Sequence, residues 1–205
     1  MVLSSDYELL TDAIREVARS QSSMAKLARA ARTRSNIESE WIYEIDGTQV
    51  LEKIDTAREV NFGERRRADL RINHTLIEFK STKPWYAVAE NMNDTPPRKS
   101  STQGWLGSDI HRMATCSGTV LRNGLVVTAG IFVLLVTTDG NVGTREFKGS
   151  TVAQVRATGL ARYLEWLPTH ANVEREGAVV SRVNAGKGSY YGQSAAHEAL
   201  IVRWE

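Results

Sequence analysis

Residues 69–80, with the sequence DLRINHTLIEFK, constrain the fold of this chain more than any other segment. Asn73 and His74 stand between two short runs in which apolar and polar residues alternate, a pattern typical of a β-hairpin with a two-residue turn. A hairpin that turns there would place Asp69 directly opposite Glu78. The segment therefore predicts two adjacent antiparallel strands with two facing carboxylates.

The alternation also predicts which side chains share a face of these strands, because successive side chains in a strand point to opposite sides. The apolar face would carry Leu70, Ile72, Ile77 and Phe79. The other face would carry Asp69, Glu78 and Lys80. Two facing carboxylates repel each other, but a divalent cation would remove the repulsion because hard cations take carboxylate oxygens as ligands. A lysine beside them completes a set of groups suited to phosphodiester hydrolysis.

Asp69, followed on the next strand by Glu78-Phe79-Lys80, resembles the motif of the PD-(D/E)xK nuclease superfamily, which has the restriction-endonuclease-like fold. The surrounding string RRADLRINHTLIEFKST is similar to the family in spacing and in its apolar strands. Ala68 stands where the proline of the family name would be, and many members lack that proline. The resemblance covers residues 57–82 and, more loosely, the flanking helices, and it identifies no subfamily.

The resemblance implies an α/β fold in which a central mixed β-sheet is flanked by helices, with a restriction-endonuclease-like core and an N-terminal helical extension. It implies a metal-dependent nuclease that acts as an endonuclease on DNA rather than RNA. Asp69, Glu78 and the Phe79 carbonyl would hold one or two Mg²⁺ ions, for which Mn²⁺ can substitute. Lys80 would orient or help to deprotonate a water molecule, or offset charge in the transition state.

The family often supplies a further glutamate from the helix before its first core strand. Glu40 is the first candidate for that role and Glu38 is the second. Many relatives are homodimers, so the resemblance also implies a homodimer. Two alternatives stay open: a catalytically inert module of the same fold that binds nucleic acid or a protein partner, and an enzyme of another class that uses the carboxylate pair with a metal.

Length and composition predict a single domain over residues 1–205, and the resemblance implies that this domain is nuclease-like. Its expected parts are an N-terminal helical segment (1–40), a core (41–167) and C-terminal strands (168–205). The single cysteine, Cys116, excludes an internal disulfide and fits a reducing compartment. The start of the chain carries Asp6 and Glu8 rather than a secretory signal, and the apolar run 125–136 is too short to span a bilayer. We therefore expect a cytoplasmic protein.

The formal net charge of +2 is too small to indicate nucleic-acid binding by itself, so any basic footprint must be local. The first candidates are Arg65, Arg66 and Arg67, the densest basic run, which shortly precedes Asp69 and would either bind a phosphate close to the metal or simply point to solvent. Arg19 and Lys26 would lie on the polar side of an N-terminal helix, where they contact phosphates or simply face solvent. Arg98 and Lys99 lie in residues 81–101, a long segment predicted to form a flap over the substrate. Asp109 follows that segment and is not assigned to the site.

Three predictions of secondary structure bear on the position of these residues. A single helix is predicted from residue 6 to about residue 34, started by a capping box of Ser5 and Glu8. A second helix is predicted to end near residue 40, followed by a β-hairpin over residues 41–54. The glycine-rich segment AGKGSYYG (185–192) is predicted to be a flexible connector between two strands, because it lacks the context of a phosphate-binding loop.

Overall fold

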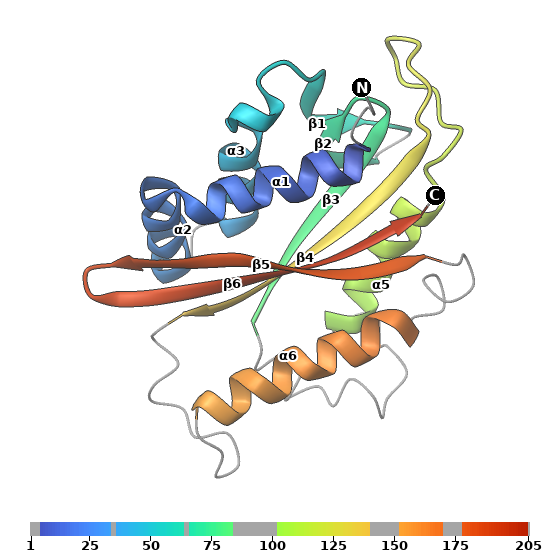
Figure 1. The fold of residues 1–205 in the computed structure, drawn as a ribbon. Coiled ribbons are helices and arrows are strands. Elements are labelled where there is room, and N and C mark those ends of the chain that lie inside the picture. The colour runs from blue at the N-terminus through green and yellow to red at the C-terminus, as the bar shows by residue number, and fades with distance from the viewer. Residues whose placement is uncertain are drawn as a thin grey trace.

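The computed structural model describes residues 5–33, 36–63, 66–83, 102–139, 152–169 and 178–204. In this part of the chain, six strands form one mixed sheet in the order β1-β2-β3-β4-β6-β5 (Figure 1). The strands are β1 (Thr56–Asn61), β2 (Arg67–Ile72), β3 (Thr75–Thr82), β4 (Ala129–Asp139), β5 (Val179–Tyr190) and β6 (Gln193–Trp204). β3 and β4 are parallel, whereas the other neighbours are antiparallel.

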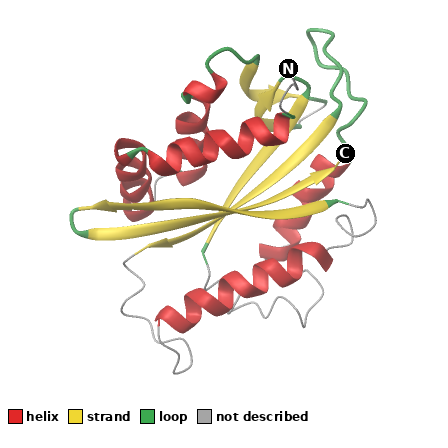
Figure 2. Cartoon of the chain, in the orientation of Figure 1, coloured by secondary structure: helices red, strands yellow, loops and turns green. Residues whose placement is uncertain are grey.

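Helices cover both faces of this sheet (Figure 2). One face carries α1 (Asp6–Arg19), α2 (Gln21–Thr33) and α3 (Ile37–Asp46), followed by the short 3-10 helix η1 (Gln49–Leu51). The other face carries α5 (Thr102–Ala114) and α6 (Val152–Thr169). Each layer of helices encloses its own hydrophobic core against the sheet. The predicted fold class, an α/β domain with a mixed sheet flanked by helices and N-terminal helices, is confirmed.

The predicted hairpin of β2 and β3 is present, with its turn at Asn73-His74. The pairing runs from Ile72↔Thr75 to Leu70↔Ile77 and ends one pair before the predicted pair of Asp69 and Glu78. The reason is that the carboxylate of Asp69 takes the place of a backbone acceptor: Asp69 Oδ2 accepts the Phe79 N–H at 2.7 Å. The two strands therefore separate at the end where their acidic residues lie.

Burial of the hairpin follows the predicted alternation. The apolar side chains Leu70, Ile72, Ile77 and Phe79 all belong to the core beneath α1, α2 and α3. On its other edge, β3 pairs with β4 along its full length, from Thr75↔Ala129 to Thr82↔Val136. β3 therefore stays paired with β4 beyond the point where its pairing with β2 ends.

The N-terminal helices differ from the sequence prediction in two ways. The capping box of Ser5 and Glu8 is present, but the helix ends at Arg19, where Ser20 adopts an extended conformation and α2 begins anew. The predicted hairpin over residues 41–54 is wrong, because α3 continues to Asp46. Its apolar residues recur at helical spacing and are buried, and Asn36 caps it by accepting the Ser39 N–H. The Asp46-Gly47 pair thus ends a helix rather than turning a hairpin.

The prediction of a flexible connector at residues 185–192 is also wrong, because β5 and β6 form one long hairpin through it. Gly188 explains the glycine content: a Cβ atom there would lie 2.0 Å from the carbonyl oxygen of Met24 in α2. The glycine therefore lets α2 lie directly on β5. The turn itself is Tyr191-Gly192.

Candidate active site

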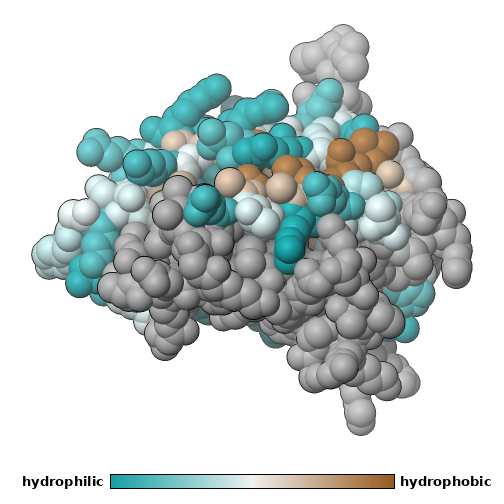
Figure 3. Space-filling view, turned by 90° about the horizontal axis from the view of Figure 1, so that it is seen from below, coloured by the Kyte–Doolittle hydropathy of each residue, from teal (hydrophilic) through white to brown (hydrophobic). Residues whose placement is uncertain are grey.

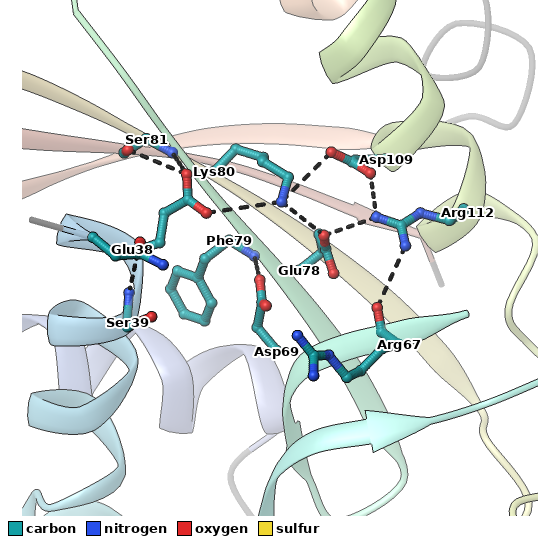
Figure 4. Close-up of polar contacts among 11 residues, drawn as sticks. Glu38, Ser39, Arg67, Asp69, Glu78, Phe79, Lys80, Ser81, Asp109 and Arg112 are labelled. Carbon is teal, nitrogen blue, oxygen red and sulfur yellow. Dashed lines mark hydrogen bonds and ion pairs between the residues drawn. The ribbon is translucent and has the colours of Figure 1, made fainter. Parts of the chain in front are cut away.

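Charged side chains gather where β2 and β3 separate, between α3 on one side and α5 on the other (Figure 4). We call this group the charged cluster, and its members are Glu38, Asp69, Glu78, Lys80, Asp109 and Arg112. Glu38 comes from α3, whereas Asp109 and Arg112 come from α5. The remaining three members come from the separated ends of β2 and β3.

Lys80 lies at the centre of the charged cluster. Its Nζ is 3.0 Å from Glu78 Oε1, 3.7 Å from Asp109 Oδ2 and 3.8 Å from Glu38 Oε2. Burial, the largest single influence, lowers the pKa of the Lys80 ammonium, but the charges of the three carboxylates together raise it above its ordinary value. Lys80 is therefore a cation at neutral pH.

The two carboxylates from the hairpin are poorly stabilised as anions. Burial raises the pKa of the Asp69 carboxyl above its ordinary value, and the hydrogen bond from the Phe79 N–H only partly offsets this effect. Burial, and next the negative charge of Asp69, raise the pKa of Glu78 in spite of the nearby Lys80 and Arg112. Glu78 is only 3% exposed, so little solvent compensates for its charge. These two groups repel each other, as the sequence predicted.

Arg112 and Asp109 join the site from α5, one helical turn apart. Arg112 Nη2 donates to Glu78 Oε1 at 2.8 Å and also to Asp109 Oδ1. Its Nη1 donates to the carbonyl oxygen of Arg67 in β2 at 3.4 Å. Arg112 therefore links α5 to both strands of the hairpin. The sequence analysis did not name Arg112 and left Asp109 unassigned, although their i, i+3 spacing is the signal that places both on one face of a helix.

The charged cluster contains more negative charge than it neutralises. Its four carboxylates face two cations, Lys80 and Arg112, so two negative charges remain when all six groups are ionised. Among the described residues, no donor forms a hydrogen bond with two buried oxygens, Glu78 Oε2 and Asp109 Oδ2, although Lys80 Nζ lies 3.7 Å from the latter. A buried carboxylate oxygen that accepts no hydrogen bond raises the free energy of the folded state, so this arrangement favours the binding of a further cation.

A polar cavity of about 490 Å³ opens beside the cluster. Asp69, Lys80 and Glu38 line it, so the cluster is accessible from this side. Arg58 and Arg67 also line the cavity, and both side chains are about half exposed. A phosphate group that enters this space would therefore meet arginines on its way to Lys80.

The residues predicted to hold a divalent cation fit that role. Mg²⁺ usually binds one or two carboxylates and keeps several water or phosphate ligands. The N–H and C=O groups of one residue in a strand point to the same side, so the Phe79 carbonyl points toward β2, as does the N–H that binds Asp69. The unpartnered Glu78 Oε2 provides another acceptor. Within the described segments, no three His, Cys, Asp or Glu side chains lie close enough to share an ion, so an ion bound here would have at most two of these side chains as ligands.

The structure separates the two glutamates proposed from α3. Glu38, the second candidate, accepts the Ser81 N–H at 2.8 Å and lies beside Lys80. Glu40 is about 200° further round the helix, where its charge acts on Lys26 of α2. The structure thus brings Glu38 into the charged cluster and leaves Glu40 outside it.

The basic residues proposed to contact nucleic acid do not form one group. Lys26 forms an ion pair with Glu44 (2.6 Å), and Arg19 is exposed in a separate groove. Arg67 lies at the cavity and pairs with Glu59 at 3.4 Å, while Arg66 is exposed nearby. Arg65, Arg98 and Lys99 lie outside the described residues, as does most of the predicted flap.

Comparison of the chain with protein-family models, with curated proteins and with solved structures found no match. Among the described helices, none combines the length and the apolar character needed to cross a membrane. The chemistry of the charged cluster and of the cavity beside it therefore carries the functional argument.

Proposed function

We propose that the protein is a metal-dependent nuclease that hydrolyses phosphodiester bonds and acts as an endonuclease on DNA. The observation that carries this proposal is the charged cluster: crowded carboxylates, two of whose buried oxygens accept no hydrogen bond from a described residue, a protonated lysine among them, and a cavity alongside that arginines help to line. The resemblance of Asp69 and Glu78-Phe79-Lys80 to the PD-(D/E)xK motif supports the same chemistry.

Asp69, Glu78 and the Phe79 carbonyl would hold Mg²⁺ or Mn²⁺. When bound there, the ion would polarise the scissile phosphate and lower the pKa of a coordinated water. The two carboxylates among these ligands are already held in place. Arg112 fixes Glu78 against α5, and the Phe79 N–H fixes Asp69 against β3. This support holds the acidic oxygens in one arrangement before the substrate arrives.

Lys80 would act as a cation in this reaction. Because its pKa is raised, it is poorly suited to remove a proton from water, and it is well suited to stabilise the negative charge that develops on the phosphate. Glu38 would position Lys80 through its 3.8 Å ion pair and hold β3 through its hydrogen bond from the Ser81 N–H. Arg58 and Arg67 would attract the phosphate backbone at the cavity.

A second function, a catalytically inert module of the same kind that binds nucleic acid or a protein partner, is favoured by one specific observation. Lys80 and Arg112 both contact Glu78 Oε1, and Glu78 is almost fully buried. An ion that binds Glu78 must therefore compete with two cations of the protein itself. A chain in which these ion pairs persist would keep the fold and bind without cleaving.

Cleavage assays separate the two functions. The protein is incubated with supercoiled plasmid, single-stranded DNA and RNA, with Mg²⁺, with Mn²⁺ or with chelator. Lys80→Ala is run in parallel, and Lys53→Ala, which removes an exposed lysine outside the cluster, serves as the matched control. The nuclease predicts metal-dependent cleavage of DNA that Lys80→Ala abolishes and Lys53→Ala retains. Binding without cleavage under every metal condition would instead identify the inert module.

A further inference from the structure

A second surface, at the end of the β5–β6 hairpin, combines exposed arginines with tyrosines. Tyr190 ends β5 and Tyr191 begins the turn, while Arg29 and Arg32 reach them from the last turns of α2. We call these four residues the Tyr–Arg surface. In Figure 1 the hairpin turn and α2 lie together at the left side of the molecule.

The rings and the guanidinium groups of this surface are in contact with one another. The two tyrosine ring centroids are 4.5 Å apart, with 72° between the ring planes. Arg32 Cζ lies 5.8 Å from the centroid of Tyr191 and 5.9 Å from that of Tyr190. Arg29 Cζ lies 5.9 Å from the Tyr190 centroid. These contacts arrange the four side chains as one platform.

No carboxylate neutralises this platform within the described residues. Neither α2 nor β5 contains an Asp or a Glu. Arg29 and Arg32 are exposed and form no ion pair with another described residue. This differs from Lys26 on the same helix, which is paired with Glu44. Two positive charges at the platform thus have no counter-charge among the described residues.

A groove of about 440 Å³ extends the positive charge along β5. Arg19 and Lys187 line it, and both side chains are exposed. Ser189 also lines the groove and directly precedes Tyr190 in β5. The groove and the Tyr–Arg surface are therefore neighbours along β5 and α2, and we call the two together the basic track.

Tyr191 occupies its place at a conformational cost. Its φ is +47° and that of Gly192 is +74°, so the turn needs the left-handed region at both central positions, where Asn-Gly is preferred. A bulky residue with positive φ is uncommon, yet Tyr191 is 81% exposed and gains little from burial. An exposed aromatic ring in a strained turn is better explained by binding than by folding.

We infer that the Tyr–Arg surface and its groove bind single-stranded nucleic acid. Aromatic rings stack on unpaired bases of any sequence, and a line of uncompensated cations follows the phosphates. Figure 3 views the molecule from below, and the described residues at its left end, the end where the β5–β6 turn lies in Figure 1, are coloured hydrophilic to neutral. The choice of nucleic acid among polyanions rests on the proposed nuclease function.

The track also leads toward the charged cluster. Arg32 is four residues before Asn36, which caps α3 and lines the cavity beside Asp69 and Lys80. Four residues of chain span at most about 14 Å between Cα atoms. One strand of nucleic acid is long enough to contact both places, so the Tyr–Arg surface would guide a single strand to the cluster.

The test measures binding without cleavage. Fluorescence anisotropy follows a labelled oligothymidine of twenty nucleotides in the presence of chelator. The variants are Arg29→Glu/Arg32→Glu, Tyr191→Leu and Tyr191→Phe. Arg122→Glu, which reverses an exposed arginine between α5 and β4, is the matched control. Thermal unfolding confirms that each variant is folded.

We expect the double charge reversal to weaken binding at least tenfold and to flatten the dependence on salt by about 0.7 in the log–log slope for each lost phosphate contact. Tyr191→Leu should weaken binding about fivefold or more, whereas Tyr191→Phe, which keeps the ring, binds as the wild type does. Unchanged binding in the double variant, an equal loss in Arg122→Glu, or a preference for duplex DNA or anionic vesicles would each overturn the inference. This test measures binding and not cleavage, so its result is independent of the cleavage assay. Either proposal, single-strand binding at this surface or nuclease activity at the charged cluster, can therefore be contradicted while the other is supported.

Discussion

The two ends of the β2–β3 hairpin both contain buried charge, but they differ in how completely that charge is neutralised and hydrogen-bonded. At the turn, Arg71 is 5% exposed and donates to both carboxylate oxygens of Asp55, at 2.8 and 2.9 Å, and to the Asn73 carbonyl. Asp6 accepts from the Asn73 side chain and from the Thr75 hydroxyl. Every charged group at this end has partners that suit its charge.

The open end of the same hairpin lacks this balance. Four carboxylates share Lys80 and Arg112, and no described residue donates a hydrogen bond to Glu78 Oε2 or Asp109 Oδ2. Arg71 at the turn lowers the pKa of Asp55 through a hydrogen bond, whereas burial raises the pKa of Asp69 and Glu78 at the open end. A satisfied network stabilises the fold, while an unsatisfied one marks the place where the protein has room for a ligand.

The largest expected effect is on catalysis at the open end. Lys80→Ala removes the cation that the proposed mechanism places opposite the phosphate, so we expect the cleavage rate to fall by about 10²- to 10³-fold, about 3–4 kcal/mol of barrier. Single-turnover cleavage of plasmid measures this effect. Equal cleavage rates in Lys80→Ala and in the control Lys53→Ala would show that Lys80 has no role in catalysis, and the open end would then have no functional distinction from the turn.

A second prediction concerns His197, a buried residue outside the charged cluster. His197 is 1% exposed, its Nε2 forms no hydrogen bond with any described residue, and burial lowers its pKa to about 4. The unfolded state therefore binds a proton more readily, so stability falls as the pH drops from about 6.5 to about 4, by up to about 3 kcal/mol. Urea unfolding across this range measures the slope.

His197→Gln is the control for that slope, since glutamine does not titrate. The variant should show a flatter dependence of unfolding free energy on pH than the wild type, with Mg²⁺ absent from both. An identical slope in the two proteins would show that other groups govern acid stability.

A third prediction concerns the turn end. Arg71→Met leaves the Asn73 carbonyl without its donor, while Asp55 stays hydrated because its side chain is 64% exposed. We expect the free energy of unfolding to fall by about 2 kcal/mol. At temperatures where the variant is folded, the cleavage rate should equal that of the wild type. Loss of cleavage in a fully folded Arg71→Met protein would contradict a purely structural role.

The smallest expected effect is on stability at the open end. The raised pKa of Glu78 means that folding favours its neutral form, which glutamine imitates. Glu78→Gln should therefore leave the free energy of unfolding unchanged or increase it, by less than about 1 kcal/mol, while it abolishes cleavage. Chemical denaturation in chelator measures the first quantity. A marked loss of stability would indicate that Glu78 serves the fold, as Arg71 does.

The parts of this structure that sequence predicts well depend on local patterns. The turn at Asn73-His74 and the faces of β2 and β3 follow from alternation over twelve residues. The capping box at Ser5 needs only its own first turn. The pair Asp46-Gly47, by contrast, is compatible with either a hairpin turn or the end of a helix. The helix forms because it buries Trp41 and Ile45 against the sheet.

The features that could not be predicted from the sequence depend on contacts between residues far apart in the chain. The close approach of α2 requires glycine at position 188, which in sequence reads as a flexible segment. Asp109 reaches Lys80, and Arg112 reaches Glu78, only because α5 packs on the sheet against β3 and β4. Asp69 and Glu78 could be predicted as neighbours, but the capture of the Phe79 N–H by Asp69, which ends the strand pairing, depends on side-chain geometry.

Binding of Mn²⁺ measured by isothermal titration calorimetry tests the difference between the two ends most directly. We predict that the wild type binds at least one ion per chain, that Glu78→Gln weakens this binding tenfold or more, and that Asp55→Asn at the turn leaves it unchanged. A wild-type protein that binds no Mn²⁺, or a Glu78→Gln variant that binds it equally well, would contradict the account.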